Sequence, residues 1–81
     1  MKITTDYSTC FYDAPGGFLV MIRYNDSLEL FEAYLQHKAY GIIEYMFGVS
    51  TTTYTLKEFE EIVEEQLVEY MENYAIEYMG V

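Results

Sequence analysis

The chain has 81 residues, and its fourteen acidic residues against four basic ones give a formal net charge of −10. That charge disfavours direct binding to nucleic acid or to anionic membranes, and it favours a basic protein partner. The apolar fraction of 52% is too high for a disordered chain, and the single cysteine, Cys10, cannot form an intramolecular disulfide. The sequence shows no signal-peptide pattern and no apolar run near the roughly 20 residues that span a membrane. We therefore expect one domain, residues 1–81, in a reducing cytoplasm.

The first third of the chain has the composition of β-strands. Strands are predicted at 9–12 and 18–24, with a further one at 2–7. The segment 13–17 (DAPGG) carries the proline and glycines of a tight turn. The strand at 18–24 begins with a run that is apolar on both faces (FLVMI), so we expect it to be the central strand of a small antiparallel sheet.

The middle of the chain allows two interpretations. In the first, Asp26 and Glu29 form an N-terminal capping box, and a single helix runs over about 27–47 with its apolar residues on one side. In the second, the helix ends near Gly41, where a glycine follows two cations, and 42–47 is a strand. The weak alternation of apolar and polar residues in 42–47 favours the single helix.

The last third of the chain is predicted to be an amphipathic helix over about 56–75. Thr55 and Glu58 have the spacing of a capping box at its start. At 100° per residue the apolar residues share one face, and they are Leu56, Phe59, Ile62, Val63, Leu67, Tyr70, Met71 and Tyr74. The pattern breaks at 75–81, where Glu77 would point into the apolar face and both Ile76 and Met79 would point with the acids. This apolar tail is either a partner contact or a folded-back terminus.

These elements predict an α+β fold. It would consist of an antiparallel sheet of two or three strands within about 2–24, packed on helices at about 27–47 and 56–75. The alternative is the order ββαβα, with a strand at 42–47. The Ser/Thr-rich connector 49–54 is either a short edge strand or a loop.

The sequence shows no constellation of catalytic or metal-binding residues. His37, the single histidine, falls on the polar side of the expected helix 27–47, so we expect it at the surface. Cys10 is expected to be a structural thiol in a strand, although a Cys10–His37 pair stays open at this stage. The turn 13–17 lacks the spacing and the lysine of a phosphate-binding loop, and there is neither an EF-hand loop nor a Cys/His cluster. We expect a protein that is not an enzyme and that has no cofactor and no metal.

The acidic band of the helix 56–75 is either a solvated face or a binding surface. From Glu58 to Glu72 it would extend about 21 Å at 1.5 Å per residue, with about one carboxylate every 5 Å, against one phosphate per 3.4 Å on a DNA strand. The helix has one base, Lys57, so the usual stabilising i,i+4 pairs of Glu with Lys are almost unused. The candidate partner-binding residues are Glu58, Glu60, Glu61, Glu64, Glu65, Glu69 and Glu72.

In size, charge, compact α+β pattern and Tyr- and Glu-rich helix, the chain resembles the small acidic inhibitors that phages make against host defence and repair enzymes. These include anti-CRISPR proteins, DNA-mimicking anti-restriction proteins and uracil-DNA glycosylase inhibitors. The resemblance implies an inhibitor that fills the basic groove of a DNA- or RNA-binding host protein, such as a CRISPR effector, in the host cytoplasm. Exposed tyrosines such as Tyr40 or Tyr45 would stack on arginines or fill an interface pocket. The alternative is a structural or adaptor module that pairs through an apolar helix or tail surface, for example as a homodimer, using Ile76, Tyr78, Met79 and Val81.

Overall fold

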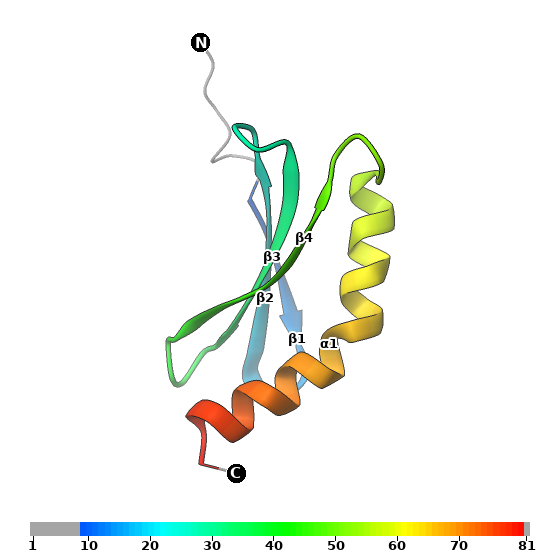
Figure 1. Cartoon of the computed structure of the whole chain (residues 1–81). Helices are drawn as coiled ribbons and strands as arrows, with labels where there is room; N and C mark the ends of the chain where they lie inside the picture. Colours follow the sequence, from blue (N-terminus) through cyan, green and yellow to red (C-terminus); the bar gives the residue numbers. More distant parts are fainter. Residues whose placement is uncertain (1–8, 81) are drawn as a thin grey trace.

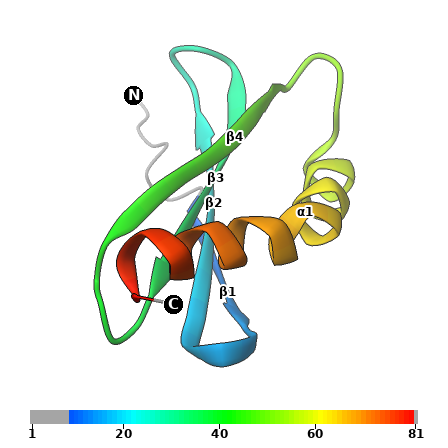
Figure 2. The same cartoon turned by 60° about the horizontal axis from the view of Figure 1, so that its bottom comes forward.

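The computed structural model describes residues 9–80, which form a four-stranded antiparallel sheet with one long helix across one of its faces (Figure 1). The strands lie in the sheet in chain order. They are β1 (Cys10–Ala14), β2 (Phe18–Asn25), β3 (Leu30–His37) and β4 (Ile43–Ser50), and the helix is α1 (Leu56–Tyr78). The strand predicted at 2–7 lies outside the described residues. Figure 2, turned by 60°, shows the second half of α1 crossing the sheet at a steep angle to the strands.

The hairpin of β1 and β2 confirms the predicted strands at 9–12 and 18–24 and the turn between them. The short 3-10 helix Pro15–Gly17 joins the two strands, and Gly16 and Gly17 take the positive φ values of 76° and 87° that favour glycine. β2 pairs with β1 on one side and with β3 on the other. It is therefore a central strand, as the apolar run at its start indicated.

The single helix predicted over 27–47 is wrong, because this segment forms the hairpin of β3 and β4. Phe31 and Leu35 are four residues apart, a spacing that places two side chains on the same side of a strand and also on the same face of a helix. Both point to the core, so the pattern alone could not separate the two periods. The ββαβα alternative was right about a strand in 42–47 and wrong about the helix before it. The fold is α+β, with four strands and one helix.

A β-bulge explains why residues 42–47 alternate so poorly. Ala33 pairs with Phe47 while Tyr34 pairs with Tyr45, so Met46 is an extra residue in β4. Met46 is buried in the core, and its neighbour Phe47 also packs against the core. Two adjacent residues thus contact the same side, which no strict alternation would predict.

The residues that were expected to begin and end a helix in the middle of the chain lie in turns between strands. Asp26 does not cap a helix, since 26–29 is a turn in which the backbone N–H of Leu28 donates to Asn25 Oδ1 at 3.2 Å. Gly41 has a φ of 76° and lies in the turn between β3 and β4, where its N–H donates to the carbonyl oxygen of His37 at 2.8 Å. In the connector 49–54, β4 extends to Ser50 and the rest forms the turn and loop that lead to α1.

The predicted C-terminal helix and its capping box are confirmed. The N–H of Glu58 donates to Thr55 Oγ1 at 3.1 Å, and the N–H of Thr55 donates to Glu58 Oε1 at 2.9 Å. α1 continues to Tyr78, a few residues beyond the predicted end near 75. Figure 1 shows that α1 bends near its middle, between its yellow and orange parts, so that its two halves follow the sheet in different directions.

The core lies between α1 and the facing side of the sheet. Its buried residues are Phe18, Val20, Ile22, Ala33, Leu35, Met46, Phe59, Val63 and Tyr74. At the first half of α1, the ring of Phe59 stacks on Phe31 at a centroid distance of 5.9 Å and meets Phe47 edge-on at 5.4 Å. Burying a side chain of this size contributes roughly 1.5–3 kcal/mol. This packing fixes which side of α1 faces outward.

Candidate functional site

The acidic outer side of α1 is the candidate site, because the charges of the chain are unevenly distributed. Within residues 9–80 there are two ion pairs, Arg23 with Glu32 at 3.3 Å and Lys38 with Asp13 at 2.8 Å. Both belong to the sheet and its turns. In that part of the chain, none of the glutamates of α1 forms an ion pair. Within residues 9–80, the glutamates of α1 therefore carry negative charge that no ion pair neutralises.

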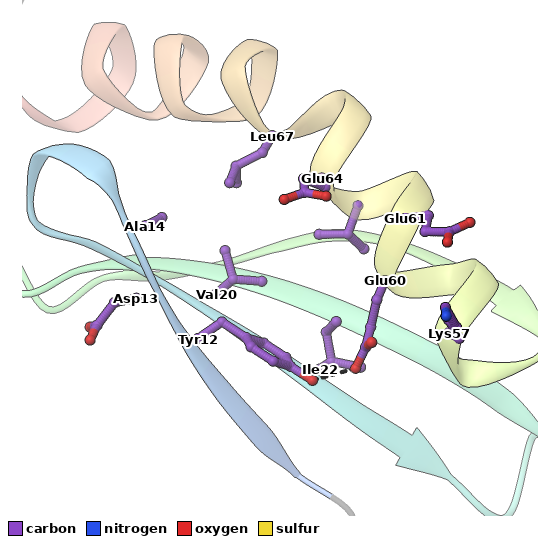
Figure 3. A pocket seen from close by; sticks show the side chains of 11 residues that line it. Tyr12, Asp13, Ala14, Val20, Ile22, Lys57, Glu60, Glu61, Glu64 and Leu67 are labelled. Atoms are coloured by element: carbon purple, nitrogen blue, oxygen red, sulfur yellow. Dashed lines mark hydrogen bonds between the residues drawn. The ribbon is translucent and has the colours of Figure 1, made fainter.

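Two of the seven predicted partner-binding glutamates already have roles within the fold. Glu58 accepts the Thr55 N–H in the capping box. Glu60 is half-buried and accepts a hydrogen bond from the hydroxyl of Tyr12 on β1 (Figure 3). That hydrogen bond, with a smaller contribution from burial, raises the pKa of Tyr12 well above its ordinary value. Glu58 thus stabilises the start of α1, and Glu60 links the first half of α1 to the middle of β1.

The other five predicted glutamates are exposed and accept no hydrogen bond from a side chain or turn of the described residues. They are Glu61, Glu64, Glu65, Glu69 and Glu72. Glu77 joins them, although the helical phase predicted that it would point into the apolar face. The phase read from the first half of α1 does not carry through the bend, which explains this error.

The bend also alters the predicted straight row of charge. Glu61 and Glu65 lie on the first half of α1, whereas Glu69 and Glu72 lie on the second half, which runs in another direction (Figure 1). A spacing similar to that of DNA phosphates therefore applies within each half and not over the whole 21 Å. The carboxylates of α1 therefore form two shorter rows and not one straight row.

Two large apolar side chains lie among these acids. Val68 is 60% exposed and Ile76 is 66% exposed. Ile76 was expected on this side, while Val68 was not singled out. At i±4 on a helix, Val68 has Glu64 and Glu72 as neighbours. Valine is β-branched and is a weaker helix former than Glu or Lys. An apolar residue of this kind in the middle of the acidic band was the feature of the sequence that could have pointed to Val68.

A groove of about 390 Å³ opens between β1 and the first half of α1 (Figure 3). Apolar side chains line it, among them Val20, Ile22 and Val63, together with the charged Lys57, Glu60, Glu61 and Glu64 and with Tyr12 and Asp13. An apolar floor with carboxylates beside it suits a long cationic side chain, whose alkyl stem packs below while its head pairs with an acid. The groove therefore extends the acidic side of α1 toward β1.

His37 is not a surface residue, contrary to the prediction, because it lies on the core side of β3 and is 9% exposed. Its Nδ1 accepts the N–H of Ala39 at 3.1 Å, so Nε2 carries the hydrogen that it donates to the carbonyl oxygen of Gly16 at 2.9 Å. The ring also meets Phe18 edge-on at 4.9 Å. His37 is thus a link between the β1–β2 turn and the β3–β4 turn.

Cys10 and His37 are far apart, which excludes a dyad between them. Cys10 pairs with Ile22 near the middle of β2, whereas His37 pairs with Phe18 at its start. These two positions are four residues apart along the strand, which corresponds to about 13 Å. Cys10 is a half-buried free thiol in β1.

The tail at the end of α1 is mostly packed onto the rest of the molecule. Tyr78 packs on Tyr74 at 4.8 Å and donates a hydrogen bond to Glu44 Oε1 at 2.5 Å. Met79 also contacts the core, so the expectation that it would point with the acids is wrong. Ile76 is the large apolar side chain of residues 75–80 that remains exposed, and Val81 lies outside the described residues.

Neither a metal site nor a membrane span is found in residues 9–80. No three His, Cys, Asp or Glu side chains come close enough there to hold an ion, and α1 is too polar to cross a bilayer. Comparison with known protein families, with curated proteins and with solved structures finds no match. What the chain does must therefore be inferred from its own side chains.

Proposed function

We propose that this protein is a non-enzymatic inhibitor that binds a nucleic-acid-processing protein, such as a CRISPR effector, through the acidic outer side of α1. The main support for this proposal is the uneven distribution of charge, since the ion pairs of residues 9–80 lie in the sheet and its turns and the glutamates of α1 form none. Like charges at i,i+4 on a helix cost about 0.2–0.5 kcal/mol per pair, and the helix has such pairs at Glu61/Glu65 and Glu65/Glu69. A cationic partner would offset this cost. Ion pairs between these glutamates and lysines on α1 itself would have been the other way to remove it.

The inhibitor would act by occupying the surface that holds nucleic acid. Carboxylates pair strongly with arginine, including arginines that read guanine in the major groove of DNA. An acidic face in a basic groove would also be attracted over a long range, which speeds the encounter and makes it sensitive to salt. The mimicry would be one of charge, with Glu61, Glu64 and Glu65 on one half of α1 and Glu69 and Glu72 on the other. The host cytoplasm would be the place of action.

The exposed apolar residues on the same face support binding over simple solubility. A face used for solubility has no need of Val68, whereas an interface gains from an apolar contact that excludes water around its ion pairs. The groove beside Tyr12 would receive an arginine or lysine of the partner. These contacts would hold the complex once charge has brought the two proteins together.

The alternative, a structural or adaptor module that pairs through an apolar surface, is favoured by the exposure of Ile76. The packing of Tyr78 and Met79 reduces the apolar tail that this alternative would use. The two functions differ in their salt dependence, because an apolar contact does not weaken as salt rises.

The test is a pull-down with the tagged protein from a lysate that contains a CRISPR effector and other DNA-binding proteins, washed at about 50 mM and then at about 500 mM salt. We expect a nucleic-acid enzyme to be retained at low salt, released at high salt and displaced by DNA. The double variant Glu65→Lys/Glu69→Lys should lose it. The matched control Asp26→Lys/Glu29→Lys changes the net charge equally at the exposed β2–β3 turn and should retain it. Equal retention of the enzyme by both variants would contradict the proposal.

A further inference from the structure

The face of the sheet opposite α1 carries a row of large side chains that crosses all four strands. Phe11 pairs with Met21, Met21 with Tyr34, and Tyr34 with Tyr45. With neighbouring strands about 4.8 Å apart, this row is about 14 Å long. The rings of Tyr34 and Tyr45 meet edge-on at 5.5 Å, and at its two ends Phe11 is 61% exposed and Tyr45 is 51% exposed.

Further apolar side chains lie beside this row, and no helix or strand of the described residues covers it. The adjacent row contains Leu19 and Ile43, with Gln36 between them. Figures 1 and 2 show α1 on the other face of the sheet in both views. We use the name outer sheet face for the surface formed by these two rows, that is by Phe11, Leu19, Met21, Tyr34, Gln36, Ile43 and Tyr45.

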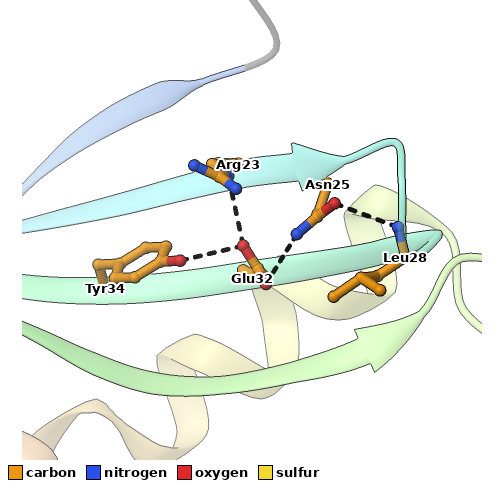
Figure 4. Close-up of polar contacts among 5 residues, drawn as sticks. All are labelled: Arg23, Asn25, Leu28, Glu32 and Tyr34. Atoms are coloured by element: carbon orange, nitrogen blue, oxygen red, sulfur yellow. Dashed lines mark hydrogen bonds and ion pairs between the residues drawn. The ribbon is translucent and has the colours of Figure 1, made fainter. Parts of the chain in front are cut away.

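The charges at the borders of the outer sheet face are balanced. Glu32 is buried there and holds Arg23, while it also accepts hydrogen bonds from Tyr34 at 3.0 Å and from Asn25 at 3.3 Å (Figure 4). At the β1 end of the adjacent row, Asp13 lies opposite Leu19 and forms an ion pair with Lys38 at 2.8 Å. Each acid is thus matched by a base, in contrast to the unpaired acids of α1.

We infer that the outer sheet face binds the same face of a second copy of this chain. In a chain with a net charge of −10, two copies repel each other wherever acidic faces meet, and this neutral apolar face avoids that repulsion. Two sheets that stack face to face lie about 10 Å apart and bury both apolar rows. The two acidic helices would then lie on opposite outer sides, separated by more than the Debye length of about 8 Å at physiological salt.

This inference stands independently of the proposed function and uses the opposite side of the molecule. If both hold, the dimer presents two acidic faces that point away from each other. Dimerisation and the binding of a basic partner depend on salt in opposite ways. Rising salt screens the repulsion between the helices and tightens the dimer, whereas it weakens the binding of a basic partner to α1.

The test is sedimentation equilibrium of the full chain over a range of concentrations at about 50 mM and about 500 mM salt. We expect a monomer–dimer equilibrium that shifts toward the dimer at high salt. Phe11→Asp/Tyr45→Asp places new charges at both ends of the row and should weaken the dimer by at least about tenfold, since like charges in a contact cost several kcal/mol. The control Val68→Asp/Ile76→Asp makes the same kind of change at equally exposed sites on α1 and should leave the dimer unchanged. All four substitutions are at exposed side chains, and circular dichroism should confirm that the variants fold.

Three results would overturn the inference. The first is a chain that remains monomeric at every concentration and salt. The second is a dimer that the α1 variant weakens as much as the sheet variant does, because the contact would then lie on the helix. The third is a monomeric full-length chain that dimerises when Ile3 and Tyr7 are changed to Asp, since residues 1–8 would then be the natural occupant of the outer sheet face.

Discussion

The hydroxyl of Tyr74 donates a hydrogen bond to the backbone carbonyl oxygen of Ile42 at 2.6 Å. The same hydroxyl accepts the backbone N–H of His37 at 3.3 Å, so one buried side chain of α1 contacts both ends of the β3–β4 turn. The ring of Tyr74 also meets Phe18 edge-on at 5.4 Å. These contacts hold the second half of an acidic, self-repelling helix on the sheet.

Tyr74→Phe should lower the free energy of unfolding by about 1–3 kcal/mol, because it keeps the ring but leaves one buried and one partly buried backbone group without their partner. Urea unfolding measures the effect. Tyr70→Phe is the matched control, since the ring of Tyr70 stacks on Phe47 at 6.0 Å and its hydroxyl makes no hydrogen bond among residues 9–80. A loss of stability that is the same for both variants would show that the hydrogen bonds of Tyr74 contribute nothing specific.

Gly48 and Gly41 should respond differently to the same substitutions. A Cβ at Gly48 would lie 3.0 Å from the carbonyl oxygen of Phe31 and 3.0 Å from the hydroxyl of Tyr45, whereas nothing lies within 4 Å of one at Gly41, whose φ is 76°. Gly48→Ala should therefore cost about 1–3 kcal/mol through overpacking, and Gly41→Ala about 1–2 kcal/mol through its backbone conformation.

Substitution by asparagine distinguishes overpacking at Gly48 from the unfavourable backbone conformation at Gly41. Asn tolerates the left-handed conformation better than Ala, so Gly41→Asn should be more stable than Gly41→Ala in thermal unfolding. At Gly48 the larger side chain should cost at least as much as Ala does. An improvement with Asn at both sites would mean that the crowding around Gly48 does not limit stability.

Removing charge from the outer side of α1 should stabilise the fold. Glu61→Gln/Glu65→Gln/Glu69→Gln abolishes two like-charge i,i+4 contacts and should raise the free energy of unfolding by about 0.5–1 kcal/mol at low salt. The gain should nearly vanish at about 1 M salt, where the Debye length is about 3 Å. If the triple variant is instead less stable than the wild type at low salt, these carboxylates make stabilising contacts within the fold.

Tyr78 should make stability depend on pH in the alkaline range. Its hydrogen bond to Glu44, followed by desolvation and the charge of that carboxylate, raises the pKa of Tyr78 from 10.0 to about 12. A raised pKa means that the folded state favours the protonated phenol, so this stabilisation is complete below pH 10 and is lost as the pH rises toward 12. The stability difference between the wild type and Tyr78→Phe should therefore be constant up to about pH 9 and shrink above pH 10. A difference that stays constant up to pH 12 would show that the hydrogen bond does not favour the phenol form.

Local signals in the sequence were sufficient where a single chemical pattern decides the structure. Thr55 and Glu58 predicted the start of α1 because a capping box satisfies backbone groups within four residues of each other. Pro15 and the two glycines of 13–17 predicted the first turn for a similar reason. In contrast, Phe31 and Leu35 fit both a helix and a strand, and the choice depended on pairing with β2 and β4, which are distant in sequence.

The sequence predicted which glutamates belong to the acidic side of α1, but it did not predict which of their carboxylates remain free or how they are arranged in space. Which carboxylates remain free depends on Tyr12, which is 48 residues away from Glu60 in the sequence. Glu77 lies exposed beyond the bend of α1, and no proline or glycine within 56–78 signals that bend in the sequence. The outer sheet face could not be foreseen at all, because two of its four strands had been assigned to a helix.

The binding of α1 to a basic partner is tested most directly by the dissociation constant of the complex with a captured nucleic-acid enzyme, measured from about 50 to about 500 mM salt. For the wild type we predict that the affinity falls by at least about tenfold over this range. Glu65→Lys/Glu69→Lys should bind weakly at every salt concentration, and Asp26→Lys/Glu29→Lys should follow the wild type. An affinity that does not change with salt, or equal binding by these two double variants, would contradict the acidic side of α1 as the binding surface.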